Sequence, residues 1–270
     1  MSHQPSTTFI LPVYNGAEFV AESIESICSQ TFQDWTLLIL DNCSSDNTQE
    51  VCAPFLKDAR IHYIRNEKNI GLLGNLLKGI ELTQTPYWCY VCHDDKFTSP
   101  DAVQIAYDIL EADPEISMVT SPCQWMDSKS KIFFSALEPV HGKLDGDEVA
   151  KVMMRRTRIT FGLIMLARTE LVKPFLPEVR WQSVADADLF ITISKGRKVF
   201  IYEQPMYAVR FHKSNNSMST YIDVRAKYRL VAQKHNIQLS LIENMIQFFN
   251  HIKVVVAKTL FFIYLNYFRK

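Results

Sequence analysis

Two adjacent carboxylates, Asp94 and Asp95, directly follow an apolar run at residues 87–92. Side by side at the mouth of a buried strand, the two charges would be costly without a counter-charge. A divalent cation that also binds phosphate oxygens would supply one, because Mg²⁺ takes one or two carboxylates together with substrate phosphates. The alternative is that Asp94 and Asp95 are polar loop residues ahead of a helix that begins near Ser99. The neighbouring elements bear on this choice.

The first 120 residues alternate between strand and helix patterns. Four apolar runs predict strands, at 8–13, 35–40, 61–65 and 87–92. Helical patterns lie between and after them, at 18–30, 46–53, from 69 and from 99. The longest runs are continuously apolar, as is typical of parallel strands that are covered on both faces. We therefore expect an α/β fold with a doubly wound, mostly parallel sheet.

Polar clusters follow three of these predicted strands. They run from Pro12 to Gly16, from Asp41 to Asp46 and from His93 to Asp95. Ligands of such sheets bind beyond the carboxyl ends of the strands. Because parallel strands end at the same edge, the three clusters are expected to converge, and this favours a metal and phosphate site at Asp94 and Asp95.

From Ile116 onward the pattern is less regular. Helices are predicted at 145–156 and 186–194, and strands at 160–167, 199–202 and 206–211. We expect this half to extend the same sheet and to shape a second binding site. The absence of a linker predicts one domain over residues 1–220, followed by a helical tail over 221–270.

The composition is that of a globular protein, with 47% apolar and 21% charged residues. Lys plus Arg and Asp plus Glu balance at 29 each, so no global basic field attracts nucleic acid. The six cysteines lack the spacing of a disulfide framework, and we interpret Cys89-x-x-Cys92 as core packing. The first residues carry no apolar secretory segment, which favours a cytoplasmic location.

Glycine-rich phosphate loops are missing from the sequence. No G-x-G-x-x-G follows the first strand, and no G-x-x-x-x-G-K-[ST] occurs anywhere. Metal and side chains must therefore hold any phosphates. Four segments instead resemble the inverting family 2 glycosyltransferases of the GT-A fold: L-P-V-Y-N-G at 11–16, L-L-I-L-D-N-C-S-S-D-N-T at 37–48, N-I-G-L-L-G-N at 69–75 and H-D-D at 93–95. The resemblance is good over residues 7–120 and looser over 160–215.

This resemblance implies a nucleotide-sugar donor of UDP or dTDP type, bound by residues 1–120, and an acceptor side at 121–220. Pro12, Tyr14 and Asn15 would line the base and ribose pocket. Asp41 would accept a hydrogen bond from the base imide, and Asn75 would lie near the nucleotide. Three of these residues have structural alternatives: Tyr14 as a buried core tyrosine, Asp41 as a turn-forming aspartate and Asn75 as a solvated helix position.

The H-D-D run corresponds to the family's D-x-D element, with a departure. Depending on the alignment, Cys92 or His93 replaces its first aspartate. Of Asp94 and Asp95, one would bind Mg²⁺ or Mn²⁺ and the other would reach the ribose. His212, in a segment similar to the family's R-x-H…S element, would be a third ligand or a diphosphate contact, with a structural histidine as the alternative.

An inverting transferase needs a general base on the face opposite the leaving nucleotide. The resemblance points to Asp186, with Ala185 in place of the family's glutamate. Asp186 could instead stabilise a helix N-terminus electrostatically, and Asp188 is the second candidate.

The tail contains an apolar stretch at 252–268 that Lys253 and Lys258 interrupt. It is short and charged for a spanning helix, so we expect an interfacial helix at the inner face of the plasma membrane. The alternative is a helix that packs on its own domain or on the partner of a homodimer.

Together these features predict a metal-dependent, hexosyltransferase-type enzyme of cell-surface polysaccharide or lipopolysaccharide synthesis, with a saccharide or lipid-linked acceptor. A nucleotidyltransferase is one alternative, although it normally needs a glycine-rich basic loop after its first strand. The replacements at Cys92 and Ala185 motivate a second alternative, a catalytically silent binding module of the same fold.

Overall fold

The structure, a computed structural model, describes residues 4–135, 140–156, 165–178, 185–212 and 230–237. An eight-stranded sheet forms its centre, in the order β3-β2-β1-β4-β10-β6-β11-β9. Its strands are β1 (Thr7–Val13), β2 (Trp35–Asp41), β3 (Ile61–Arg65), β4 (Tyr87–Tyr90), β6 (Ile116–Thr120), β9 (Gly142–Asp145), β10 (Leu166–Arg168) and β11 (Lys198–Ile201). The first four strands are parallel to one another, whereas β10 runs antiparallel to both neighbours and β9 runs antiparallel to β11. The predicted α/β class with a mostly parallel sheet is confirmed.

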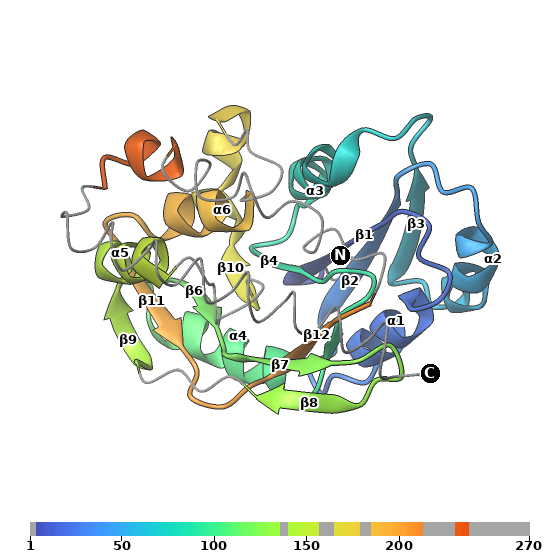
Figure 1. Cartoon of the computed structure of the whole chain (residues 1–270), viewed down its shortest axis with the longest axis horizontal. Helices are drawn as coiled ribbons and strands as arrows, with labels where there is room; N and C mark the ends of the chain where they lie inside the picture. The colour runs from blue at the N-terminus through green and yellow to red at the C-terminus, as the bar shows by residue number, and fades with distance from the viewer. Residues whose placement is uncertain (1–3, 136–139, 157–164, 179–184, 213–229, 238–270) are drawn as a thin grey trace, which may run out of the picture.

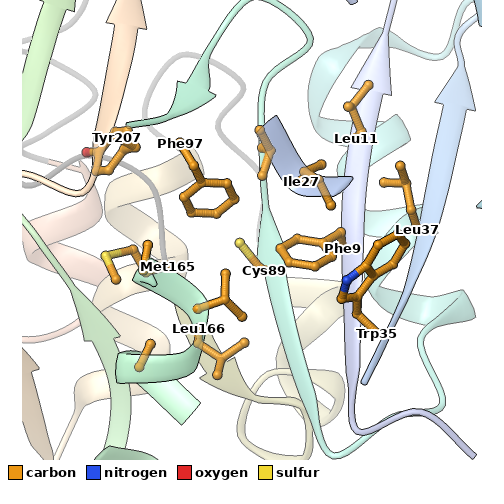
Figure 2. Packing of buried hydrophobic residues seen from close by; sticks show 14 of the residues in the cluster. Phe9, Leu11, Ile27, Trp35, Leu37, Cys89, Phe97, Met165, Leu166 and Tyr207 are labelled. Atoms are coloured by element: carbon orange, nitrogen blue, oxygen red, sulfur yellow. The ribbon is translucent and has the colours of Figure 1, made fainter. Parts of the chain in front are cut away.

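Helices cover both faces of this sheet (Figure 1). The helices are α1 (Val20–Cys28), α2 (Thr48–Cys52), α3 (Gly71–Leu82), α4 (Ala102–Ala112), α5 (Gly146–Arg156) and α6 (Ala185–Ser194), with 3-10 helices η1 (Ala53–Lys57), η2 (Thr169–Leu171) and η3 (Lys173–Glu178). On one face α3, α5 and α6 pack against alternate strand residues such as Ile10 and Trp88. On the other face α1 and α4 pack against Phe9 and Leu37. Figure 2 shows this second core, in which the Phe9 and Trp35 rings meet edge to face with centroids 5.9 Å apart.

Gly79 allows α3 to lie directly on the sheet. A Cβ atom at this position would come within 2.4 Å of Ile10 Cγ2 and 2.7 Å of Leu40 Cδ1. Because real Cβ atoms do not approach so closely, the missing side chain sets the distance between α3 and strands β1 and β2. It thereby fixes the C-terminal half of α3 against β1 and β2.

A second, four-stranded sheet was not expected from the sequence. It consists of β5 (Lys96–Phe97), β12 (Tyr207–Arg210), β7 (Cys123–Met126) and β8 (Ile132–Ser135), in that order. The expectation that the second half only extends the main sheet is therefore wrong for 206–211, which forms β12 in the second sheet. Of the strand predicted at 160–167, the last two residues belong to β10. Residues 157–164 lie outside the described residues.

Most of the predicted tail lies outside the described residues, including the apolar stretch at 252–268. Its described segment, 230–237, packs on the main core through Val231 and Ala232. No helix in the described part of the chain is both long and apolar enough to cross a membrane.

Candidate active site

The three polar clusters converge at one edge of the main sheet, as the sequence predicts. Strands β1 and β2 are in register to their last residues, Val13 and Asp41, and β4 pairs with β1 on its other side. The Asn15 amide donates to Ser44 Oγ over 2.9 Å, which joins the first two clusters. Gly16 packs directly against His93 of the third cluster, because a Cβ atom on Gly16 would lie only 2.4 Å from His93 Cδ2.

The loop after β1 is held in one conformation by side chains. Asn15 has a positive φ of 50°, and its Oδ1 accepts from the Ser45 amide over 2.8 Å. The Gly16 amide donates to Thr48 Oγ1 over 2.9 Å. Pro12 is buried in β1, whereas Tyr14 projects outward and is 46% exposed. The alternative of a buried core tyrosine is therefore wrong, and the Tyr14 ring is accessible to a ligand.

Asp41 ends β2 with its carboxylate fully buried and bonded on both oxygens. Oδ1 accepts from the Ser44 amide over 2.9 Å, which confirms the turn-forming alternative for this oxygen. Oδ2 accepts from Tyr63 Oη over 2.7 Å and from Arg65 Nη1 over 2.5 Å. The Arg65 side chain is 40% exposed, so it is the donor at Asp41 that a ligand can replace most readily.

Asn75 lies inside the protein, at 1% exposure, so the alternative of a solvated helix position is wrong. Its Nδ2 donates to the Leu40 carbonyl over 2.6 Å, and its Oδ1 accepts from Asn66 Nδ2 over 2.9 Å. Asn66 also receives a 2.7 Å hydrogen bond from Lys78 Nζ. In this structure Asn75 joins α3 to the end of β2.

Asp94 and Asp95 are both nearly buried, and different groups hold them. A hydrogen bond of 2.9 Å joins His212 Nε2 to Asp94 Oδ2. Asp95 Oδ1 accepts from the Arg210 amide over 2.9 Å. The structure thus places His212, the third predicted metal ligand, against Asp94.

Cys92 also belongs to this cluster. One ligand atom from each of Cys92, Asp94 and Asp95 lies within 4.8 Å of the others. The interpretation of Cys92 as core packing is incomplete, because its thiol reaches the carboxylates as well as the core. The sequence offered Cys92 only as the residue that replaces the first aspartate of the D-x-D element in one alignment, and strand alternation does not apply to it because it follows the end of β4.

The two carboxyl groups differ in their electrostatics. Burial, and then the charge of Asp94, raise the pKa of Asp95 well above its usual value. Burial also acts to raise the pKa of Asp94, but the hydrogen bond from His212 and the nearby His93 bring it below its usual value. Burial, followed by the charges of Asp95 and Asp94, raises the pKa of the Cys92 thiol well above its usual value.

These residues fit a divalent cation. Burial first, and then repulsion by Asp94, disfavour the charged form of Asp95, and a bound cation would offset both. Carboxylate oxygens suit Mg²⁺ and Mn²⁺, whereas the thiol of Cys92 is a soft ligand and binds metals only after it loses its proton. Asp94 and Asp95 are therefore the stronger ligand candidates in the cluster.

Arg210 holds the loop of the two aspartates in place, a role that the sequence did not reveal. It is only 1% exposed, and its Nε donates to the Asp94 carbonyl over 2.8 Å. Its other nitrogens bond Ser130 Oγ over 2.8 Å and the carboxylate of Glu22. The guanidinium also lies over the Phe19 ring, 4.6 Å from its centroid. The sequence signal that could have revealed this role is the charge of Arg210 within an apolar strand, because a buried charged side chain must find partners.

Asp186 is the second residue of α6, and its side chain lies outside what the structure describes. Asp188, in the same helix, is fully buried. It accepts from Lys234 Nζ over 2.9 Å and is joined to His235 Nε2 over 2.7 Å. This arrangement makes Asp188 a structural residue, so Asp186 stays as the candidate base.

The comparison with protein families agrees with the fold. The model described as Glycosyl transferase family 2 matches residues 8–151, and the chain belongs to this family. A glycosyltransferase of Rickettsia felis is 27% identical over 80% of this chain and 34% of its own length. TuaG of Bacillus subtilis, named for teichuronic acid biosynthesis, is 30% identical over 35% of this chain and 38% of its own length. The chain thus spans about a third of the length of these two relatives.

Solved structures show the same fold at low sequence identity. The crystal structure of S. aureus TarS residues 1–349 in complex with UDP-GlcNAc has a TM-score of 0.68 and 15% identity. That match covers 90% of this chain and 70% of the TarS chain. A complex of the same TarS fragment with UDP has a TM-score of 0.60 and 12% identity. The expected GT-A fold is confirmed.

Proposed function

We propose that this protein transfers a sugar, with inversion at the anomeric carbon, from a nucleoside-diphosphate sugar to a saccharide or lipid-linked acceptor. The observation that carries this proposal is the pair Asp94 and Asp95 beside His212, at the shared edge of β1, β2 and β4. This edge is where doubly wound sheets bind ligands. Bound UDP-GlcNAc and UDP in TarS support a UDP-type donor, and dTDP is the alternative.

Cell-surface polysaccharide synthesis is the proposed setting. TuaG carries a name from teichuronic acid biosynthesis. WcaA of Escherichia coli, named for colanic acid biosynthesis, is 29% identical over 36% of this chain and 36% of its own length. Both names refer to polysaccharides of the cell surface, which supports an acceptor of the same class.

In our proposal the first cluster binds the nucleoside. The accessible Tyr14 ring stacks on the base, and Pro12 and Asn15 shape the pocket beside it. The base imide donates to Asp41 Oδ2 in place of the exposed Arg65. Asn75 contributes by fixing α3 against the end of β2, where the nucleotide would lie.

Asp94 and Asp95, with His212 beside them, would hold a divalent cation of Mg²⁺ or Mn²⁺ type. When bound, such a cation neutralises the leaving diphosphate. Arg210 keeps both carboxylates in position through the Asp94 carbonyl and the Asp95 side chain. Asp186 takes the proton of the acceptor hydroxyl on the opposite face of the sugar, which inversion requires.

Calorimetric titration of UDP tests the metal site. We expect Mn²⁺ to strengthen UDP binding to the unaltered protein, and the double variant Asp94→Ala, Asp95→Ala to lose this strengthening. Asp108→Ala, on the exposed side of α4, is the control and should keep it. Equal Mn²⁺-dependent affinity in the double variant would remove the metal assignment, and parallel titration of dTDP identifies the nucleotide.

Asp186→Asn tests the base. We expect release of UDP from UDP-sugars to fall by about 10²–10⁴-fold, the usual contribution of general base catalysis, with UDP affinity unchanged. Retained turnover in Asp186→Asn would exclude Asp186 as the base. Pyrophosphate release from a nucleoside triphosphate and a sugar phosphate would favour a nucleotidyltransferase instead, and binding of UDP-sugars without any turnover would favour a silent module.

A further inference from the structure

The hairpin formed by β7 and β8 exposes large apolar side chains to solvent. Ile132, Phe133 and Phe134 are consecutive and are 42%, 43% and 44% exposed. They lie on β8, one of the two edge strands of the small sheet. In Figure 1, β8 runs along the lower margin of the molecule. Edge strands of soluble proteins usually carry charges or prolines, and a contiguous apolar patch commonly marks an interaction site.

A β-bulge distributes these side chains over both sides of the hairpin. Trp125 pairs with Phe134 and Met126 with Ile132, so Phe133 is the extra residue. The Trp125 ring contacts the rings of Phe134 and Phe211, with centroids 4.5 and 4.9 Å away. The hairpin therefore has an aromatic cluster on one side and Ile132 on the other.

Two lysines accompany the apolar residues. Lys129 and Lys131 are exposed, and neither forms an ion pair with any carboxylate of the described residues. Their amides donate to Asp127 Oδ1 over 2.8 and 3.1 Å, which fixes the turn that carries them. The tip of the hairpin thus combines two available positive charges with three exposed apolar side chains.

We propose that this hairpin inserts into the interfacial region of a bilayer that contains anionic phospholipids. Aromatic and aliphatic side chains of this kind are buried at the boundary of headgroups and acyl chains, and lysines beside them bind anionic headgroups. The two lysines favour an anionic bilayer over a second copy of this equally charged hairpin. A saccharide would need hydrogen-bonding side chains, and Ile132, Phe133 and Phe134 offer none.

Membrane docking through the hairpin would orient the candidate active site. Arg210 Nη1 bonds the Asp127 carbonyl over 3.2 Å and Ser130 Oγ over 2.8 Å, both in the turn that precedes β8. The same guanidinium bonds the Asp94 carbonyl through Nε. Arg210 therefore ties the hairpin to the loop of the two aspartates. Given the proposed function, this geometry suits a lipid-linked acceptor, whereas membrane binding itself does not depend on transfer activity.

Vesicle sedimentation of the full chain tests the proposal. We expect binding to vesicles of phosphatidylcholine with phosphatidylglycerol, and weaker binding to phosphatidylcholine alone. The double variant with both Phe133→Ser and Phe134→Ser should have a partition coefficient that is lower by about tenfold or more. Lys129→Gln and Lys131→Gln should each reduce it about fivefold, on the anionic vesicles only. The control is Leu56→Ser, Lys57→Gln on η1, where Leu56 is 41% exposed; it should bind as the unaltered protein does.

Hydrogen exchange distinguishes the hairpin from other membrane contacts of the chain. Amides of residues 127–135 should become protected when vesicles are added. Unchanged partitioning of the Phe133→Ser, Phe134→Ser variant, or protection confined to other segments, would overturn the proposal. So would a concentration-dependent dimer that this variant abolishes, because a second copy would then occupy the patch. These measurements use no nucleotide sugar, so their failure leaves the proposed transfer reaction untouched.

Discussion

The carboxylates of Asp94 and Asp95 are adjacent in sequence but have different partners. Asp94 accepts from a side chain, His212, whereas Asp95 accepts from the main chain of Arg210. A side-chain partner can rotate away when a ligand arrives, but a main-chain partner in a strand cannot. We therefore expect Asp94 to reorient on ligand binding and Asp95 to stay fixed.

Tyr14 provides a prediction at the scale of one residue. Because the side chain is 46% exposed, Tyr14→Ala should leave the thermal unfolding temperature unchanged. Stacking of an aromatic ring on a base contributes about 1–3 kcal/mol, so the affinity for UDP should fall about tenfold. Tyr14→Phe keeps the ring and should bind UDP nearly as well as the unaltered protein. Equal loss in both variants, measured by calorimetry, would argue against stacking.

The sequence predicted the residues that lie in short contiguous motifs and missed those that meet only in three dimensions. Asp94 and Asp41 each follow an apolar strand, so their position at the sheet edge could be inferred. Glu22 and Arg210 are 188 residues apart, and no local pattern connects them. Cys92 was misjudged because strand alternation does not apply beyond the last residue of β4.

At the scale of elements, Glu22 connects α1 to the small sheet. It accepts from Ser130 Oγ over 2.7 Å and from Lys96 Nζ over 2.5 Å, and it pairs with Arg210. Burial acts to raise the pKa of Glu22, but these hydrogen bonds and the Arg210 charge lower it below its ordinary value of 4.5. A carboxyl group with a lowered pKa stabilises the folded state above its unfolded pKa, and this stabilisation is lost as the pH falls through the folded pKa.

Glu22→Gln should therefore lower the stability of the protein at neutral pH, and it should lower the stability less at acidic pH. Since the side chain of Glu22 is 32% exposed, solvent screening limits the loss to about 1 kcal/mol, or about 2–4 °C in the unfolding temperature. The difference from the unaltered protein should shrink below about pH 4.5. Thermal unfolding at pH values from 7 to 3 measures this difference, and Glu18→Gln, at an exposed position, is the control. A difference that is independent of pH would contradict the role of the Glu22 charge.

Elements were predictable where burial made them long and periodic. The strands at 61–65 and 35–40 and the helix at 145–156 were located to within one or two residues. Strands β5 and β10 have only two and three residues, too few to show alternation. β8 is exposed at all four positions, so it lacks the apolar and polar pattern of a half-buried strand.

At the scale of the whole molecule, the buried Asp188 joins the segment 230–237 to α6. Lys234→Met removes one of its two partners and leaves a buried carboxylate that is only partly compensated. The free energy of unfolding should fall by about 2 kcal/mol, or about 4–8 °C in the unfolding temperature. In a protein that already carries Asp188→Asn, Lys234→Met should lower the free energy of unfolding by clearly less. Lys195→Met, at an exposed position after α6, is the control, and equal losses at Lys195 and Lys234 would contradict the pairing.

The antiparallel β10 has a consequence for how the chain is made. β4 pairs with β1 on one side and with β10 on the other, and all four of its residues are buried in the finished protein. Roughly 80 residues separate β4 from β10, and they take about 4–16 s to synthesise at ordinary rates. During that interval the nascent chain presents an apolar strand edge with no neighbour, a site of aggregation. Residues 1–120, although they carry most of the candidate nucleotide contacts, should therefore fail as a separately expressed fragment.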